Sequence, residues 1–380
     1  MSAAHEAERV SAAREAERVS AGLVAVVATR PAQKMRLAAW TAAWILLALG
    51  LAFGAGGAYA VSLATEMIIL SLWAVSYNLV YGYLGEISFG HAAFFGAGAF
   101  AVPLLAQRGF PFGLALVGGF VSGALFAVAM TLVLRRTRGV YYAVLTFVLA
   151  QVVYVVAIKW TDFTGGDNGL PVARPAFLDG AGRYGVFVLV IVTLALAALH
   201  RAIQSPAGRV VQAIRQNERR ATQIGYNTAV YRALTFILSG AFSGIAGALY
   251  SPFIRFVSPD VLFWTFSGQV IIMTIMGGSG TFYGPLAGVA VFVVLRDVIS
   301  SWSASSGVVA GIPVARLGEH WPLFMGLLFF LIIVFEPGGL AGIFARVRHA
   351  FSRGEMERRR RARSSRTSHA EPGSRLEERR

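Results

Sequence analysis

The feature that most constrains this chain is a series of long apolar runs from which ionisable side chains are almost absent. Between Leu37 and Gln107 the only ionisable acids or bases are Glu66, Glu86 and His91. Of the 380 residues, 14% are charged, whereas a water-soluble domain carries about 25%. Since a helix needs roughly 20 apolar residues to cross the hydrocarbon layer, we predict an all-α, polytopic integral membrane protein.

Ten segments have the length and apolar character of membrane-spanning helices. The third and eighth are short or rich in glycine and could be broken or re-entrant helices, so eight or nine crossings remain alternatives. The first follows a charged segment and is long enough to span, so we expect a span there rather than a cleaved signal peptide. The ten segments are Leu37–Tyr59, Val61–Gly82, Ile87–Leu105, Phe112–Leu134, Val140–Ile158, Tyr184–Ile203, Tyr231–Pro252, Trp264–Met276, Tyr283–Ile299 and Trp321–Phe335.

The distribution of basic residues predicts the orientation. Short loops rich in lysine and arginine stay in the cytoplasm, and such loops precede the first span, follow Leu134 and surround Arg215. The C-terminal segment from Arg346 holds twelve arginines and five glutamates. With ten crossings, these assignments agree with one another if both termini are cytoplasmic. The segments 159–183 and 300–320 are then external.

Three regions follow from composition. Residues 1–36 form a charged cytoplasmic extension with a nine-residue near-repeat, "SAAHEAERV" followed by "SAAREAERV". Residues 37–343 form the transmembrane domain, and residues 344–380 form a basic tail that we expect to be disordered. An arginine cluster beside a membrane is more typical of contact with anionic lipid than with nucleic acid, so we predict a membrane-lipid contact and no nucleic-acid partner.

Residues 204–230 form a basic segment between two predicted spans. In Arg209–Ile224 apolar residues recur at three- and four-residue intervals and polar residues occupy the other face, which predicts one amphipathic helix on the cytoplasmic side. The apolar face would hold Val210, Val211, Ile214, Ala221 and Ile224. Gly225 can end the helix in a left-handed turn. An interfacial helix that only lies on lipid is the alternative.

Several stretches closely resemble the LivM-type permeases of branched-chain amino acid ABC transporters. The resemblance extends over roughly Ser62 to Ile343 and includes the pattern Glu218-x-x-Ala221-x-x-x-Gly225, which is similar to the ATPase-coupling motif of importer-type ABC permeases. Arg219 and Arg220 depart from it, because that motif more often has small or neutral residues there. The other stretches are "YNLVYGYLGEISFGHAAFFGAGAF" from Tyr77, "TGGDNGL" from Thr164, "SGAFSGIAGALYSPF" from Ser239, "IMGGSGTFYGPLAGV" from Ile275 and "EPGGLAGI" from Glu336.

The resemblance implies a multi-pass permease subunit of an ABC importer in the plasma (inner) membrane of a bacterium, which transports branched-chain or related amino acids. Its implied partners are a LivH-type permease, two cytoplasmic ATP-binding subunits and an extracytoplasmic amino-acid-binding protein. Related permeases carry urea, short amides or aromatic amino acids, so the cargo stays open. The residues that it places at the ATPase contact are Arg209, Arg215, Glu218, Ala221 and Gly225.

Two further groups of residues are candidates for a role in transport. Ionisable groups at membrane depth usually face a cavity or a partner, so Glu86, Ser88, Gly90 and His91 could line the translocation pathway, with helix packing as the alternative. If they do, changes at Glu86 and His91 should slow uptake more than they impair assembly. The external loop with Thr164, Gly165, Gly166 and Asp167 could contact the binding protein, or be a turn and nothing more.

The sequence lacks the residues that would make the chain an enzyme. It contains no Gly-x-x-x-x-Gly-Lys-Ser/Thr phosphate loop, so a partner has to supply ATP hydrolysis. It has no cysteine and six scattered histidines, and we predict no metal site and no cofactor. A secondary transporter or channel for small polar solutes that works alone is the competing function. Co-purification of an ATPase would separate the two.

Overall fold

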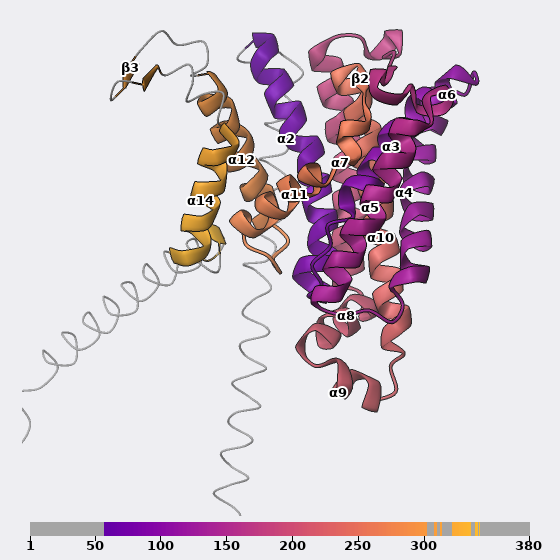
Figure 1. Cartoon of the computed structure of the whole chain (residues 1–380), viewed down its shortest axis with the longest axis vertical. Helices are drawn as coiled ribbons and strands as arrows, with labels where there is room; N and C mark the ends of the chain where they lie inside the picture. The colour runs from indigo at the N-terminus through magenta and orange to yellow at the C-terminus, as the bar shows by residue number, and fades with distance from the viewer. Residues whose placement is uncertain are drawn as a thin grey trace, which may run out of the picture.

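The structure, a computed structural model, is a bundle of helices (Figure 1). It describes residues 57–301, 308–309, 312–313, 321–335, 339–340 and 342. Within these residues, the strands form two antiparallel pairs of two residues each, β1 (Leu170–Pro171) with β2 (Phe256–Val257), and β3 (Val308–Val309) with β4 (Ile312–Pro313). The prediction of an all-α polytopic membrane protein is confirmed.

The longer helices follow the apolar runs of the sequence. Within the described residues, six helical segments are long and apolar enough to cross a membrane, and the first consists of α2 with the π-helical turn η1 (Leu79–Leu84) that continues it. Three further segments are apolar but shorter: α3, α11 and residues Pro322–Leu331 of α14. The longer helices are α2 (Gly57–Asn78), α3 (His91–Gln107), α4 (Phe112–Leu134), α5 (Val140–Lys159), α7 (Ala181–Gln204), α10 (Thr228–Ile254), α11 (Trp264–Gly277), α12 (Gly284–Ser301) and α14 (Trp321–Phe335).

Each predicted span from Val61 onward coincides with one of these helices, and α4 has the predicted bounds. The third and eighth predicted spans correspond to the short helices α3 and α11, which begin or end at irregular segments. The first predicted span and the two tails lie almost wholly outside the described residues. The number of crossings and the side on which the termini lie therefore stay predictions.

The loops gather at two ends of the bundle. Short helices α8 (Pro206–Gln216) and α9 (Glu218–Gln223) lie at one end, below α10 in Figure 1, and we call it the α8–α9 end. The loop after α4 lies there too, because Arg138 contacts Glu218 at 2.8 Å. The opposite end carries α6 (Thr161–Thr164), the 3-10 turns η2 (Gly166–Asn168) and η3 (Ala176–Leu178), and the β1–β2 pair, which η4 (Pro259–Leu262) follows. Two arginine-rich loops thus share one end, as the predicted orientation requires.

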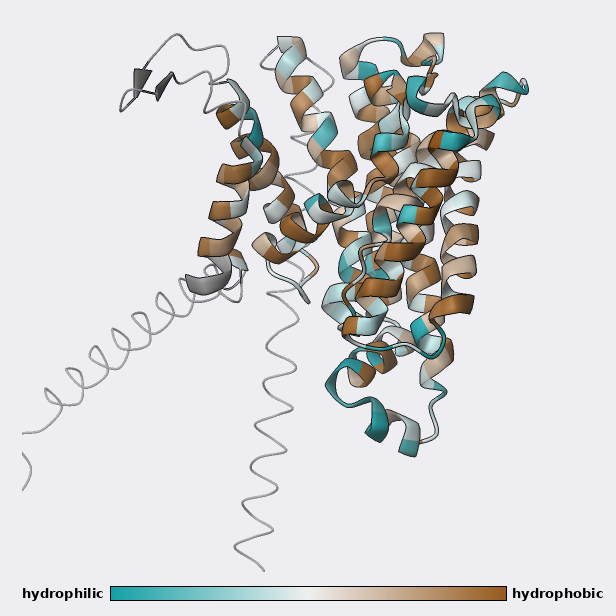
Figure 2. Ribbon diagram, in the orientation of Figure 1, coloured by the Kyte–Doolittle hydropathy of each residue, from teal (hydrophilic) through white to brown (hydrophobic). Residues whose placement is uncertain are grey.

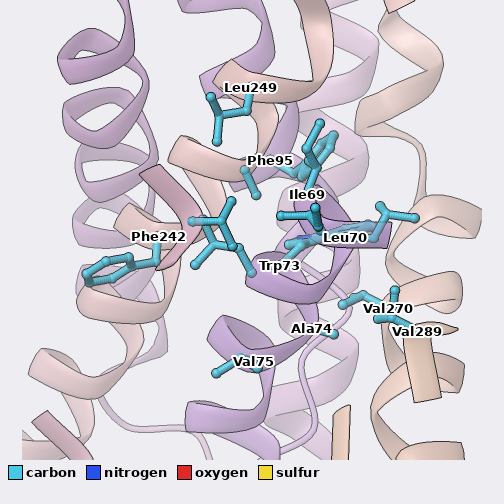
Figure 3. Packing of buried hydrophobic residues seen from close by; sticks show 14 of the residues in the cluster. Ile69, Leu70, Trp73, Ala74, Val75, Phe95, Phe242, Leu249, Val270 and Val289 are labelled. Atoms are coloured by element: carbon cyan, nitrogen blue, oxygen red, sulfur yellow. The ribbon is translucent and has the colours of Figure 1, made fainter. Parts of the chain in front are cut away.

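The hydrophobic core surrounds α2. The Trp73 ring is fully buried, and its centroid lies 4.5 Å from that of Phe95 of α3 (Figure 3). The Phe266 ring of α11 lies 5.0 Å from Trp73 by the same measure. Along α2, buried apolar residues occupy all sides of the helix from Ile68 to Val75. A helix that is apolar all round is buried in the middle of a bundle, so α2 is the central helix against which α7, α10, α11 and α12 pack.

Glycines bring α10 close to α3 and α4. A Cβ atom on Gly98 of α3 would overlap the backbone of Gly244 on α10, and a Cβ on Gly123 of α4 would overlap the Gly240 carbonyl. Small residues let backbones approach in this way where helices associate inside a membrane. Packing therefore explains Gly98, Gly240 and Gly244, and also Gly96, whose Cβ would overlap Leu262.

An ion pair joins α2 to α12 within the apolar part of the bundle. Arg296 Nη2 donates to Glu66 Oε2 at 2.7 Å, and the Tyr59 hydroxyl donates to Asp297 one residue further along α12. A charge among apolar helices is stabilised by an opposite charge. Glu66 therefore has a partner from a helix more than 200 residues away, which the periodicity of either segment could not reveal.

Candidate functional site

The basic segment at the α8–α9 end consists of two short helices. Ser205 caps α8 by accepting a hydrogen bond from the Gly208 amide at 3.1 Å, and Pro206 occupies the first turn. At Asn217 the backbone becomes extended, and its side chain accepts from the Arg220 amide at 3.0 Å to begin α9. The prediction of one helix over Arg209–Ile224 is wrong, because Asn217 ends one helix and caps the next.

The apolar face of this segment packs against its own chain. Val210, Val211, Ile214 and Ala221 are buried in a cluster with Leu84 at the end of η1. Ile224 was predicted on the same face, but 69% of it is exposed. The break at Asn217 rotates α9 relative to α8, so the spacing that aligns Ile224 with Ile214 in one continuous helix no longer applies.

Gly225 ends α9 as the sequence predicts. Its φ is +98°, its amide donates to the Thr222 carbonyl at 3.0 Å, and the next amide, of Tyr226, donates to the Ala221 carbonyl at 3.2 Å. This is the Schellman arrangement, in which a left-handed residue closes the last turn. The chain then turns back to α10, which Asn227 caps by accepting from the Val230 amide.

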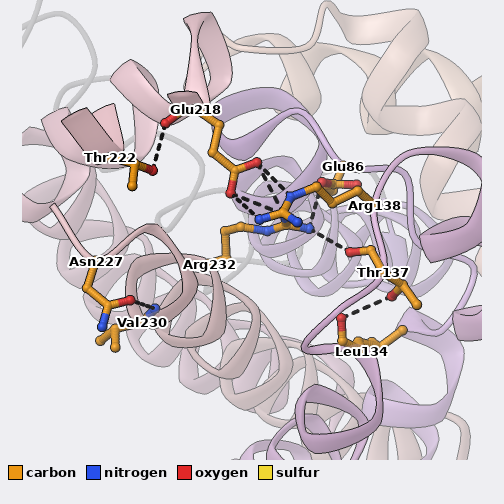
Figure 4. Close-up of polar contacts among 9 residues, drawn as sticks. All are labelled: Glu86, Leu134, Thr137, Arg138, Glu218, Thr222, Asn227, Val230 and Arg232. Atoms are coloured by element: carbon orange, nitrogen blue, oxygen red, sulfur yellow. Dashed lines mark hydrogen bonds and ion pairs between the residues drawn. The ribbon is translucent and has the colours of Figure 1, made fainter. Parts of the chain in front are cut away.

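Four charged residues brace α9 against the bundle (Figure 4). Arg138 donates to both carboxylate oxygens of Glu218 at 2.8 Å, and Arg232 of α10 lies 2.8 Å from Glu86 and 3.5 Å from Glu218. Arg232 also donates to the Thr137 carbonyl at 3.1 Å. We call Glu86, Arg138, Glu218 and Arg232 the charge cluster. It joins α9, the base of α10, the loop after α4 and the loop before α3.

The hydrogen bonds from Arg138 keep the Glu218 carboxyl ionised to a lower pH than usual. They lower the pKa of the Glu218 carboxyl to about 2, with a further lowering from the Arg232 charge. The pKa of Arg138 is raised by the same hydrogen bonds. A bidentate arginine–carboxylate pair fixes geometry as well as charge, so the cluster holds α9 in one orientation at neutral pH.

Glu86 lies apart from the other pathway candidates. It belongs to the charge cluster at the α8–α9 end, whereas Ser88 and His91 are fully buried inside the bundle. Sequence reasoning missed Arg232, although a single arginine four residues into an apolar span was a signal that a carboxylate lies nearby.

Ser88, Gly90 and His91 begin α3 in the interior. Ser88 Oγ accepts from the Gly90 amide at 3.2 Å and lies 3.2 Å from His91 Nδ1. His91 Nε2 lies 2.8 Å from Ser239 Oγ, whose proton goes to the Ser76 carbonyl. Ser239 therefore accepts from Nε2–H, and Nδ1 accepts from Ser88.

Aromatic rings of Tyr77, Phe94 and Phe236 surround the imidazole edge to face. Both nitrogens have partners and the ring is enclosed, which favours the packing interpretation of His91 over a pathway.

The remaining coupling candidates point in different directions. Arg209 is exposed on α8. Arg215 turns back to the bundle, where its Nη1 donates to the Gly82 carbonyl of η1.

The glycine-rich loop closes a tight turn at the opposite end. Gly165, Gly166 and Gly169 have positive φ values of 77°, 57° and 60°. The Thr164 hydroxyl donates to the Ala157 carbonyl at 2.5 Å and the Trp160 carbonyl at 2.8 Å, which fastens the loop to α5. Asp167 is exposed at its surface.

In the part of the chain that the structure describes, no group of three or more His, Cys, Asp or Glu residues could hold a metal ion. The polar groups there are instead arranged as ion pairs and helix caps. The ion pairs and caps hold neighbouring segments in fixed positions relative to one another. Two surfaces, the tip of α9 and the glycine-rich loop, lie at opposite ends of the bundle.

Known proteins resemble this chain over most of its length. Residues 59–335 match the family model described as branched-chain amino acid transport system / permease component. The high-affinity branched-chain amino acid transport system permease protein LivM of Escherichia coli (strain K12) is 25% identical over 311 residues, which cover 74% of this chain and 69% of LivM. A probable LivM of Methanocaldococcus jannaschii is 28% identical over 234 residues, covering 60% and 66%.

The LivH permease of the same Escherichia coli strain is 23% identical over 295 residues, which cover 72% of this chain and 91% of LivH. The family match and the LivM relatives agree with the arrangement of apolar helices, since both require a multi-pass inner-membrane protein. This chain belongs to the branched-chain amino acid transport system permease family, as a LivM-type member of a family of transporter components and not of enzymes.

Proposed function

We propose that this chain is the LivM-type permease subunit of an ABC importer for branched-chain amino acids. It forms the translocation path with a LivH-type permease, two cytoplasmic ATP-binding subunits drive transport, and an extracytoplasmic amino-acid-binding protein delivers the cargo. The LivM and LivH relatives are both permease proteins of a high-affinity branched-chain amino acid transport system, which supports the cargo and the pairing of two permeases.

One observation carries the proposal: α9 is a braced projection with an apolar tip. The ribbon is apolar along the bundle and becomes hydrophilic at α9 (Figure 2). At the tip, however, Ile224 is 69% exposed and Tyr226 is 43% exposed. A rigid helix end with exposed large apolar residues inside a polar rim is typical of a protein contact.

This geometry changes the role of Ala221 in the proposal. The resemblance to the coupling motif places Ala221 at the ATPase contact. Ala221 is buried against Leu84 and Ile214 of its own chain. It sets how closely α9 approaches the bundle, and Ile224 and Tyr226 contact the ATPase.

Co-purification of the ATP-binding subunits tests the proposal. We expect wild-type chain, expressed with the LivH-type permease, to retain them. Ile224→Ser should weaken the association about tenfold or more, because burying one Ile side chain contributes about 1.5–3 kcal/mol. Leu234→Ser is the matched control, since Leu234 is 56% exposed and lies further along α10. Uptake without any associated ATPase would instead establish a carrier that works alone.

Uptake measurements test the cargo. In a strain that lacks the transporter, the complex should accumulate labelled leucine, isoleucine and valine, and these should compete with one another. Labelled phenylalanine and urea serve as the comparison. Accumulation of urea alone would overturn the cargo while leaving the ABC assignment intact.

The glycine-rich loop with Thr164, Gly165, Gly166 and Asp167 is the proposed docking site of the amino-acid-binding protein. Support comes from its place at the end opposite α9 and from the exposure of Asp167. Asp167→Asn should reduce stimulation of ATP hydrolysis by the binding protein and leave basal hydrolysis unchanged. Unchanged stimulation would return the loop to a structural turn.

A further inference from the structure

Two helix breaks lie side by side close to the α8–α9 end. The first is the π-helical turn η1 and the left-handed Gly85 that follows α2, and the second is the segment between α11 and α12, where Gly278 and Gly280 have φ values of 107° and 78°. The first break lies in the quoted stretch that begins at Tyr77, and the second lies in the stretch that begins at Ile275, about 200 residues later in the chain. Breaks of this kind persist in a membrane only where other groups satisfy their backbone.

Asn78 fastens the two breaks together. Its Oδ1 accepts from the Gly280 amide at 3.0 Å, and its Nδ2 donates to the Thr281 carbonyl at 2.8 Å. The side chain is fully buried and uses both ends of its amide. Gly82 permits the contact, because a Cβ there would overlap Asn78 Oδ1 and the Gly280 amide. The two breaks are therefore one packed unit, which we call the break pair.

Arg215 connects α8 to the break pair. Its aliphatic stem passes over Gly85, with Cγ 3.0 Å from the position that a Cβ on Gly85 would take. Its Nη1 donates to the Gly82 carbonyl and lies 2.9 Å from the position of a Cβ on Gly280. One guanidinium group thus meets both breaks, at a helix end where backbone carbonyls lack intrahelical partners and favour a cation.

The surroundings give this side chain room to move. A cavity of about 360 Å³ lies beside it, lined by Arg215 together with Glu86, Glu218 and Arg232 of the charge cluster. The coupling segment therefore contacts the bundle through the charge cluster, through the apolar cluster around Leu84 of η1, and through Arg215. Among these contacts, that of Arg215 meets both breaks.

We propose that Arg215 is the positioning residue that transmits movement of α8 to the break pair, rather than a residue that docks the ATPase. The inference rests on the proposed function, since it assumes that an ATPase moves the α8–α9 segment. When α8 shifts, the guanidinium displaces the backbone at Gly82 and Gly280. This movement displaces the adjoining ends of α2 and α11.

The test uses the complete complex in proteoliposomes, with Arg215→Gln, Arg215→Lys and, as control at an exposed position of the same helix, Gln216→Ala. Arg215→Gln should co-purify with its partners and hydrolyse ATP, but uptake per ATP hydrolysed should fall about fivefold or more, because coupling between two sites typically changes an equilibrium by at least that factor. Arg215→Lys should recover part of the loss, and Gln216→Ala should match wild type. Normal uptake per ATP in Arg215→Gln would overturn the inference.

A second readout distinguishes transmission from a general loss of structure. The chain contains no cysteine, so Ser279→Cys places a single thiol beside Gly280. Its maleimide labelling rate should change between the nucleotide-free and ATP-bound complexes when Arg215 is present, and should stop responding to nucleotide in Arg215→Gln. A response that persists in Arg215→Gln would overturn the inference. So would loss of ATPase association in that variant, which would make Arg215 a docking residue. Failure of the wild-type chain to retain an ATPase would instead refute the proposed function.

Discussion

Arg232 Nη2 lies 2.8 Å from Glu86 Oε1, and this contact fixes the base of α10 to the loop that precedes α3. Arg232 is 12% exposed and Glu86 is 14% exposed, so water solvates the pair weakly. The same guanidinium reaches Glu218 and the Thr137 carbonyl. Arg232 is therefore the residue on which the charge cluster depends.

We expect Arg232→Ala to lower the free energy of unfolding by about 2 kcal/mol or more, because it leaves the largely buried Glu86 carboxylate without its partner. Arg138→Ala is the control: its side chain is 56% exposed, so its pair should contribute about 0–1 kcal/mol. Thermal unfolding in detergent compares the two variants. Equal shifts would contradict the central place of Arg232.

Acid should release α9 from the bundle. The pKa of Glu218 is lowered to about 2, chiefly by the hydrogen bonds from Arg138. A carboxyl with a lowered pKa stabilises the fold fully above its ordinary pKa of about 4.3 and loses that contribution as the pH falls toward about 2. A spin label at Arg220→Cys should gain mobility across that window and none between pH 6 and 8. Glu218→Gln should remove the transition; a transition that remains would assign it to another group.

His91→Ala should impair folding more than transport. It removes two buried hydrogen bonds and a ring enclosed by Tyr77, Phe94 and Phe236, so we expect a loss of about 3 kcal/mol or more. Thermal unfolding, and uptake per correctly folded molecule, separate the two effects. A variant of normal stability with slow uptake would restore the pathway hypothesis for His91.

Two glycine substitutions test the close approach of the helices. Gly113→Ala on α4 meets no atom within 4 Å and should stabilise slightly, by up to about 1 kcal/mol, through lower backbone entropy of the unfolded chain. Gly98→Ala places its methyl group on the Gly244 backbone and should destabilise by about 1–3 kcal/mol. Similar thermal stabilities of the two variants would show that α3 and α10 are not in close contact.

The orientation is tested with reporters. A reporter fused after Arg138 or Ala207 should be cytoplasmic, and one inserted near Asp179 should be external. The arginine content of the first two loops and their shared end of the bundle support this expectation. A cytoplasmic reporter at Asp179 would reverse the orientation.

The helices could be predicted from sequence because a single quantity, hydropathy over about 20 residues, decides whether a segment spans a membrane. The bounds of α4 illustrate this. The contacts of the coupling segment could not be predicted in the same way. Asn217 divides that segment because its side chain caps α9, and the outward position of Ile224 follows from the resulting rotation.

The partners of the charged residues could not be predicted from the spacing of apolar residues either. Glu86 meets Arg232 and Glu66 meets Arg296 only because helices far apart in sequence lie side by side. Arg215 looked like one more residue on a polar face, yet it contacts the break pair. Isolated arginines inside apolar runs were the signals that could have identified these partners. Which acid each arginine pairs with could be decided only from the fold.

Helix α10 extends without interruption from the charge cluster to the opposite end of the bundle. Its 27 residues give a rod about 40 Å long. Beyond its far end, β2 pairs with β1, the strand that follows the glycine-rich loop, and Arg174 donates to the Pro252 and Phe253 carbonyls in its last turn. The two faces proposed to receive partners therefore lie at the two ends of one helix. A tilt of α10 as a rigid body would displace both faces together, which would couple the two partner sites across the membrane without a chain of side-chain rearrangements.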